Sequence, residues 1–108
     1  MAAWITLFIA GVLEVAWATS MKQSEGFTRP LASGMTIALA LASFWLLALA
    51  MKSLPLGTAY AIWTGIGAVG AFVVGIVFLG EAASPMRITA AVLIVAGLAL
   101  MKIGGTTA

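Results

Sequence analysis

Glu14 is the residue of this chain with the clearest chemical capacity, because it lies near the middle of an apolar stretch over residues 2–21. Burial away from water disfavours the charged form of a carboxyl group, so such a group takes up a proton near neutral pH. A cation can then replace that proton. The apolar stretches contain no basic residue that would form a structural ion pair with Glu14. Ionisable residues placed in this way are functional by default, and Glu14 is therefore predicted to alternate between a proton and a positively charged substrate.

Aromatic and hydroxyl side chains at helical spacing provide the surroundings for Glu14. Trp17 follows Glu14 by one helical turn on the same face, where it offers a flat ring and one N–H donor. Tyr60 and Trp63 share a helix face in the same way, and Ser43 is the central polar residue of another apolar stretch. Because aromatic faces attract cations, these residues predict a pocket for a small cation. For the aromatic residues, plain packing or a place at the membrane interface is the alternative.

A glycine-rich segment over residues 65–70 matches the pattern G-x-G-x-x-G. A dinucleotide site is excluded, because that fingerprint requires a preceding strand and an acid about 20 residues further on, whereas this segment lies inside a long apolar stretch. Gly65 and Gly67 are instead predicted to form a hinge that bends the helix. Close helix packing by small residues, with Gly67, Ala71 and Gly75 at every fourth position, is an equally weighted alternative.

The overall composition places these residues in a membrane. The chain has 108 residues, of which 64% are hydrophobic and 7% charged, and its mean hydropathy is +1.22. A soluble domain of this size cannot bury so much apolar surface. The net charge of only +2 excludes a basic nucleic-acid binder. Cys, His and Asp are absent, so disulfides are excluded and no metal, no cofactor and little catalytic machinery is expected.

Four apolar stretches are long enough to cross a bilayer as helices, which takes about 20 residues. They cover residues 2–21, 31–51, 58–79 and 86–102. No basic residue precedes the first stretch and an acid lies inside it, which argues against a cleaved signal peptide. The expected fold is an all-α, multi-pass membrane protein, with four transmembrane helices in a single domain over residues 1–108. Glu25 and Glu81 fall in the connections and are interpreted as solvated charges.

The last apolar stretch has no acid, Tyr or Trp, but small residues recur there at every seventh position. They are Ala83, Ala90, Gly97 and Gly104. Such a stripe lets two helices approach closely. Ala90 and Gly97 are therefore predicted to form a dimer interface.

The basic residues are nearly balanced between the two sides of the membrane. Four spans put both chain ends on one side, together with Lys52 and Lys102. The opposite side carries Lys22, Arg29 and Arg87. Because orientation follows a clear excess of Lys and Arg, this balance permits insertion in both directions. Two oppositely inserted copies would supply the inverted repeat that many transporters contain, although charge counts alone leave a chance balance equally open.

The chain resembles the small multidrug resistance family of bacterial inner-membrane exporters over essentially its whole length. The shared features are the four spans, Glu14 and the segment GTAYAIWTGIG at residues 57–67. The segment LEVAWA at residues 13–18 is similar to the guanidinium-exporting subtype. Two other segments, SEGFTR at residues 24–29 and SFWLL at residues 43–47, are similar to the drug-exporting subtype.

The resemblance implies an antiparallel homodimer that exchanges protons for guanidinium and small substituted guanidinium cations. Glu14 of both subunits would bind either protons or the cation. Trp17 and Ser43 would hydrogen-bond and orient the acids, while Tyr60 and Trp63 would line the pocket. Guanidinium suits such a site because it is planar and meets a carboxylate through paired hydrogen bonds.

Three other functions stay open. A polyspecific proton-coupled exporter of quaternary ammonium and aromatic cations would let tetrasubstituted ammonium ions compete for the site. A membrane scaffold would tolerate Glu14→Gln without loss, and a passive cation channel would conduct without proton coupling. An enzyme is the least expected class, because the sequence offers no pairing of nucleophile and base.

Overall fold

The computed structural model describes residues 2–105 and consists of four long helices joined by short connections. They are α1 (Ala2–Gln23), α2 (Pro30–Ala50), α3 (Leu56–Leu79) and α4 (Pro85–Gly105). Each helix is long and apolar enough to cross a membrane. The expectation of an all-helical chain with four long apolar helices is confirmed, and these helices are consistent with four membrane spans.

Prolines mark the starts of three helices. Pro30 and Pro85 are the first residues of α2 and α4, and Pro55 precedes α3 as its cap. Proline is tolerated there because the first N–H groups of a helix have no partner inside it. α3 begins at Leu56 rather than at the expected residue 58, and α4 continues to Gly105 rather than ending near residue 102. The longer helices satisfy backbone groups that have no water partner inside a bilayer.

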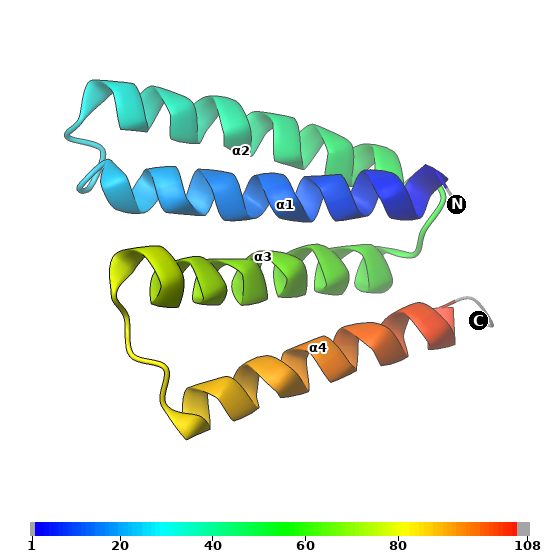
Figure 1. Ribbon diagram of the computed structural model, residues 1–108. Coiled ribbons are helices and arrows are strands. Elements are labelled where there is room, and N and C mark those ends of the chain that lie inside the picture. The colour runs from blue at the N-terminus through cyan, green and yellow to red at the C-terminus, as the bar shows by residue number, and fades with distance from the viewer. Residues whose placement is uncertain (1, 106–108) are drawn as a thin grey trace.

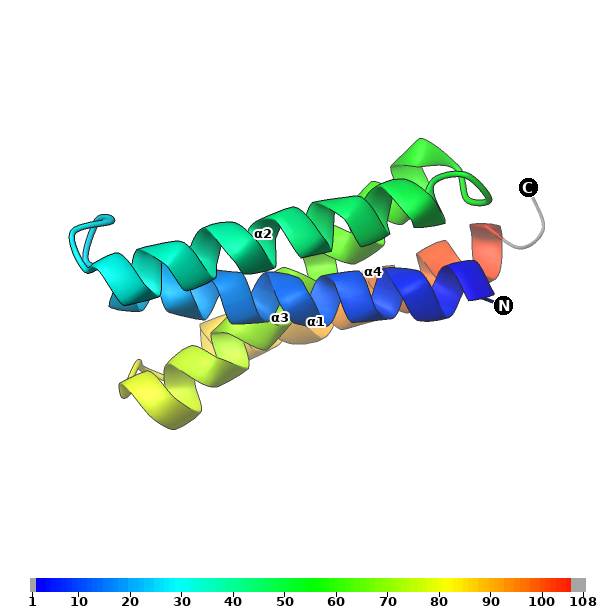
Figure 2. The ribbon, with the colours of Figure 1, turned by 90° about the horizontal axis from the view of Figure 1, so that it is seen from above.

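The helices lie side by side in the order α2, α1, α3, α4, and successive helices run in opposite directions (Figure 1). α1 packs against both α2 and α3, whereas the backbone of α4 approaches only that of α3. The molecule measures 45 × 34 × 17 Å, and the view from above shows the same thin arrangement (Figure 2). Because one helix with its side chains is about 10–12 Å across, much of the chain is only one or two helices thick.

The buried apolar side chains gather where α1, α2 and α3 meet, near the end of the molecule that holds the chain termini. They are Leu7, Ala10, Leu47, Ala50, Ala59, Ile62 and Trp63. By contrast, no residue in the most apolar segment of α4 is buried. The three helices that carry the predicted site residues therefore form the packed unit, and α4 is attached to one side of it.

Candidate functional site

Glu14 lies near the middle of α1, half-buried, with its carboxylate against the backbone of α3. Its Oε1 atom is fully covered and has no hydrogen-bond partner among the described residues. A Cβ atom added at Gly67 would overlap this carboxylate and would lie 2.7 Å from Glu14 Cγ. Gly67 therefore leaves the room that the acid occupies. A charged group inside a membrane is expensive, so the unpaired Oε1 makes Glu14 the leading candidate for a binding residue, and this role stays a prediction.

Trp17 presents the matching donor one turn further along α1. Its Nε1 atom is also covered and has no acceptor among residues 2–105. Leaving a buried donor or acceptor unmatched costs about 1–3 kcal/mol. The same face of α1 thus carries an unpaired acceptor, Glu14 Oε1, and an unpaired donor, Trp17 Nε1.

Ser43 joins all three helices of the packed unit. Its fully buried hydroxyl donates to the Ala10 carbonyl oxygen at 2.7 Å and accepts from Trp63 Nε1 at 2.9 Å. The hydroxyl proton is therefore already used, and the described chain has no hydrogen bond from Ser43 or Trp17 to the unpaired Oε1 of Glu14. The orienting roles implied by the family resemblance stay predictions. Within one chain, Ser43 holds Trp63 in place.

A row of four aromatic rings crosses α1, α2 and α3. The Trp17 and Phe44 ring centroids lie 6.1 Å apart, those of Phe44 and Trp63 5.7 Å, and those of Trp63 and Tyr60 5.6 Å. Phe44 and Tyr60 are 46% and 53% exposed, so the row is open along one side. Aromatic faces attract cations. The structure therefore brings the rings of Trp17, Trp63 and Tyr60 into one row through Phe44, and their role in a cation pocket stays a prediction.

Phe44 is the member of this row that sequence reasoning missed. It directly follows Ser43 and is an aromatic residue in the middle of a span, and those two facts were the available signal. Its role depends on which side chains of α1 and α3 lie beside it, which the spacing within α2 does not reveal.

The predicted hinge glycines lie inside an unbroken helix. α3 continues through Gly65 and Gly67 in the conformation described. The two residues face different neighbours, because a Cβ at Gly65 would lie 3.0 Å from Leu98 Cγ on α4, while Gly67 faces Glu14 on α1. Both glycines permit close packing here, and their action as a hinge stays a prediction.

The predicted dimer residues lie on an uncovered part of α4. Ala90 and Gly97 are both exposed, and a Cβ added at Gly97 meets no atom within 4 Å. They are accessible to another helix, and the interface itself stays a prediction.

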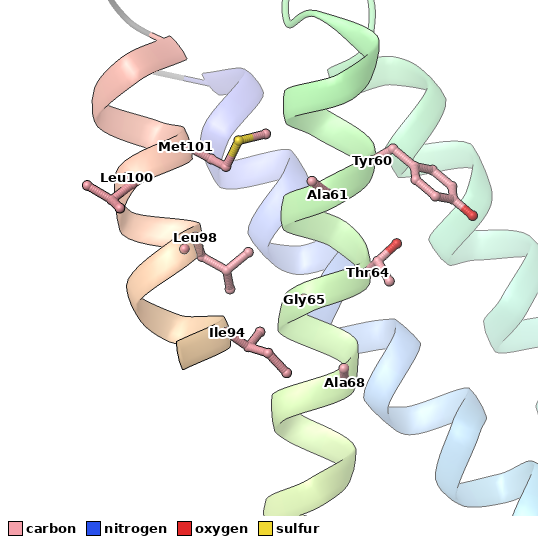
Figure 3. Close-up of a pocket in the computed structure, with 10 residues that line it drawn as sticks. Tyr60, Ala61, Thr64, Gly65, Ala68, Ile94, Leu98, Leu100 and Met101 are labelled. Carbon is pink, nitrogen blue, oxygen red and sulfur yellow. The ribbon is translucent and has the colours of Figure 1, made fainter. Parts of the chain in front are cut away.

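A separate groove between α3 and α4 has a volume of about 680 Å³ (Figure 3). Ile94, Leu98 and Met101 line it from α4, and none of its lining residues is charged. Tyr60 projects from α3 on the side away from α4 (Figure 3), and its ring belongs to the aromatic row through Trp63. The groove lacks the chemistry of a cation site, which is concentrated between α1, α2 and α3. Within residues 2–105 no three His, Cys, Asp or Glu residues gather, so no metal centre is assigned.

A family model described as Small Multidrug Resistance protein matches residues 2–102. The chain belongs to this family. Curated proteins named guanidinium exporter, from Escherichia coli strain K12 and Shigella flexneri, are each 56% identical over 100 residues, which is 93% of this chain and 95% of the relative. A guanidinium exporter from Citrobacter freundii is 55% identical over the same share of each chain. The family resemblance is confirmed, and the small multidrug resistance family transports its substrates rather than converting them, so the chain is not an enzyme.

Proposed function

We propose that the chain is a proton-coupled antiporter that exports guanidinium and small substituted guanidinium cations across the bacterial inner membrane. The unpaired, buried Oε1 of Glu14 is the observation that carries this proposal. Relatives named guanidinium exporter at 55–56% identity support the choice of cation. The four apolar helices support the membrane location.

The exchange follows from a single carboxyl group with two mutually exclusive partners. Ionised Glu14 accepts paired N–H bonds from the planar cation, and protonated Glu14 offers that cation no charge. Guanidinium has no acceptor atom, so the free N–H of Trp17 donates to a carboxylate oxygen and orients the acid. The row of rings contributes cation–π attraction to the flat cation. Each cation released is thereby replaced by protons, which couples export to the proton gradient.

Two copies inserted in opposite directions complete the transporter in this proposal. The layer is 17 Å thick along its shortest axis, and half-exposed Phe44 and Tyr60 leave the site open on one side. Lipid tails cannot hydrogen-bond a carboxylate, whereas a second copy covers it and adds its own Glu14. Exposed Ala90 and Gly97 offer α4 as a contact between the copies.

One observation favours a second candidate, polyspecific export of quaternary ammonium and aromatic cations. The aromatic row is open rather than enclosed, with Tyr60 53% exposed, and an open row of rings accepts larger cations than guanidinium. Quaternary ammonium ions have no N–H donor, so they would bind through the rings and charge alone.

Substrate-evoked currents from purified protein in liposomes test the proposal. Guanidinium and tetrapropylammonium are applied with and without a pH gradient, to the wild type, to Glu14→Gln and to Glu25→Gln as a matched control from an exposed connection. We expect a current for guanidinium alone that drives proton movement, vanishes in Glu14→Gln and persists in Glu25→Gln. Raising the pH should tighten guanidinium binding, because fewer protons compete for Glu14.

Each other outcome selects a different function. Equal currents for both cations would assign the polyspecific function. Current that moves no protons would make the protein a channel. Silence with both cations in folded protein would mean that Glu14 is not a transport site.

A further inference from the structure

A second crevice lies between α1, α3 and α4, apart from the aromatic row. Its volume is about 360 Å³, and Trp4 and Phe8 of α1 face Leu98 and Lys102 of α4 across it. Lys102 is the one charged residue in its lining, and the other lining side chains are apolar or aromatic. The crevice is thus a narrow apolar slot with a cation at one end.

The cation is held at that end by an aromatic ring. Lys102 Nζ lies 5.1 Å from the centroid of the Trp4 ring, within cation–π range. Trp4 is near the start of α1 and Lys102 near the end of α4, so both lie close to the chain termini, which Figure 1 shows at one end of the molecule. Trp and Lys are the side chains that settle at the boundary between lipid tails and headgroups.

The charges at the two ends of the molecule differ. At the end with the α1–α2 and α3–α4 connections, Glu25 pairs with Arg29 at 3.9 Å and Glu81 pairs with Arg87 at 3.6 Å. The sequence has no Asp and only three acids, and none of them belongs to the end that carries Lys52 and Lys102. Among residues 2–105, the two ion pairs of the structure leave Lys102 without a carboxylate side chain as partner.

The crevice does not include the residues of α4 through which two copies are predicted to pair. The predicted contacts Ala90 and Gly97 are not among its lining residues. Val95, Ala99 and Lys102 lie on a different face of α4 from Gly97, because residues about three or four apart share a helix face. A pairing through Ala90 and Gly97 therefore would not use the face of α4 that lines the crevice.

We propose that this crevice binds an anionic phospholipid, with one acyl chain in the apolar slot and the phosphate against Lys102 beside Trp4. Basic pockets between transmembrane helices bind anionic headgroups in this way. The apolar lining accounts for the tail, and the ammonium of Lys102 selects a headgroup with net negative charge. The site is independent of Glu14 and of the transported cation.

Native mass spectrometry of the full-length protein tests this proposal. The protein is titrated with phosphatidylglycerol or with phosphatidylcholine of the same acyl chains. The wild type should retain phosphatidylglycerol preferentially, and Lys102→Gln should weaken that binding about fivefold, as expected for one basic residue at an anionic lipid surface. Binding of phosphatidylcholine should not change. Lys52→Gln is the matched control, because it removes a lysine at the same end of the molecule without touching the crevice.

Two further measurements decide what occupies the crevice. Ala99→Trp fills it from α4, where Ala99 is exposed, and should lower retention of both lipids while the oligomeric state stays the same. Inorganic phosphate should not compete with phosphatidylglycerol, because it lacks the acyl chain.

Several results would overturn the assignment. Unchanged lipid retention in Lys102→Gln would show that Lys102 does not contact the headgroup. An equal loss of retention in Lys52→Gln would show that the lipid responds only to the general surface charge. Dissociation of the oligomer by Ala99→Trp would mean that a second copy covers the crevice. Competition by inorganic phosphate would make the site an anion site. Guanidinium currents should persist in Lys102→Gln, so failure here and failure of the transport proposal are separable.

Discussion

The two sides of α3 use the same residue type against very different neighbours. Toward α1, Gly67 makes room for the carboxylate of Glu14, and toward α4, Gly65 makes room for the side chain of Leu98. The first neighbour is a functional group whose position matters, and the second is a flexible apolar side chain that can move aside. Small residues on one helix thus make room for the candidate site on one side and for an apolar side chain on the other.

The two sides of α3 also differ in how they are joined to the neighbouring helices. On the α1 side, Ser43 links three helices through hydrogen bonds of 2.7 and 2.9 Å. On the α4 side lies an apolar groove of about 680 Å³. The site is therefore carried by a tightly joined unit of three helices, while α4 is loosely attached.

The largest expected difference between the two sides of α3 is in guanidinium transport after substitution of Gly67 or Gly65. In Gly67→Ala the new methyl group overlaps the Glu14 carboxylate and must displace it. If this displacement costs about 1.4 kcal/mol of guanidinium binding free energy, the affinity for guanidinium falls about tenfold. We expect guanidinium transport in liposomes to fall by at least that factor while the fold persists. Gly65→Ala is the comparison, because its methyl group meets Leu98, which can rotate away, so a loss of transport in this variant would report on the predicted hinge and not on the carboxylate. Equal losses in both variants would contradict the distinction between the two sides.

Ser43→Ala should loosen the three-helix unit by a smaller amount. It removes the link between Ala10 and Trp63, and hydrogen bonds between membrane helices contribute about 0.6 kcal/mol each, up to about 1.7 kcal/mol. Denaturation in mixed micelles should show a free energy of unfolding lower by about that range. Ser53→Ala, in the exposed α2–α3 connection, provides the baseline. If Ser53→Ala destabilises the protein as much as Ser43→Ala, the buried link has no special role.

Arg87→Gln should have the smallest effect and should act on the α4 side only. Arg87 donates to the Ala82 carbonyl oxygen at 2.6 Å, pairs with Glu81 at 3.6 Å and lies 5.0 Å from the Phe72 ring centroid. Because the ion pair is partly exposed, its loss should lower the free energy of unfolding by about 1 kcal/mol or less. The same denaturation experiment measures it. A marked fall in guanidinium transport would show that α4 is coupled to the site more tightly than its packing indicates.

The sequence was sufficient for the features that depend on residue type and on spacing within one helix. The apolar stretches and the prolines indicated the four helices, and Glu14 with Trp17 followed from helical spacing. The neighbours of Phe44, the bonding partners of Ser43 and the different surroundings of Gly65 and Gly67 depend on how each helix is rotated about its axis. That rotation is decided by contacts between helices, which hydrophobic patterns describe poorly when a helix is apolar on every side.

The thinness of the layer has a consequence for how the protein behaves in a membrane. A chain that measures 17 Å along its shortest axis has little interior in which to enclose a ligand. In the proposed pair of oppositely inserted copies, the second copy comes from the surrounding bilayer, so assembly of the pair would obey mass action. Transport per chain should therefore rise with the protein-to-lipid ratio until pairing saturates, and dilution with lipid should switch the protein off without unfolding it.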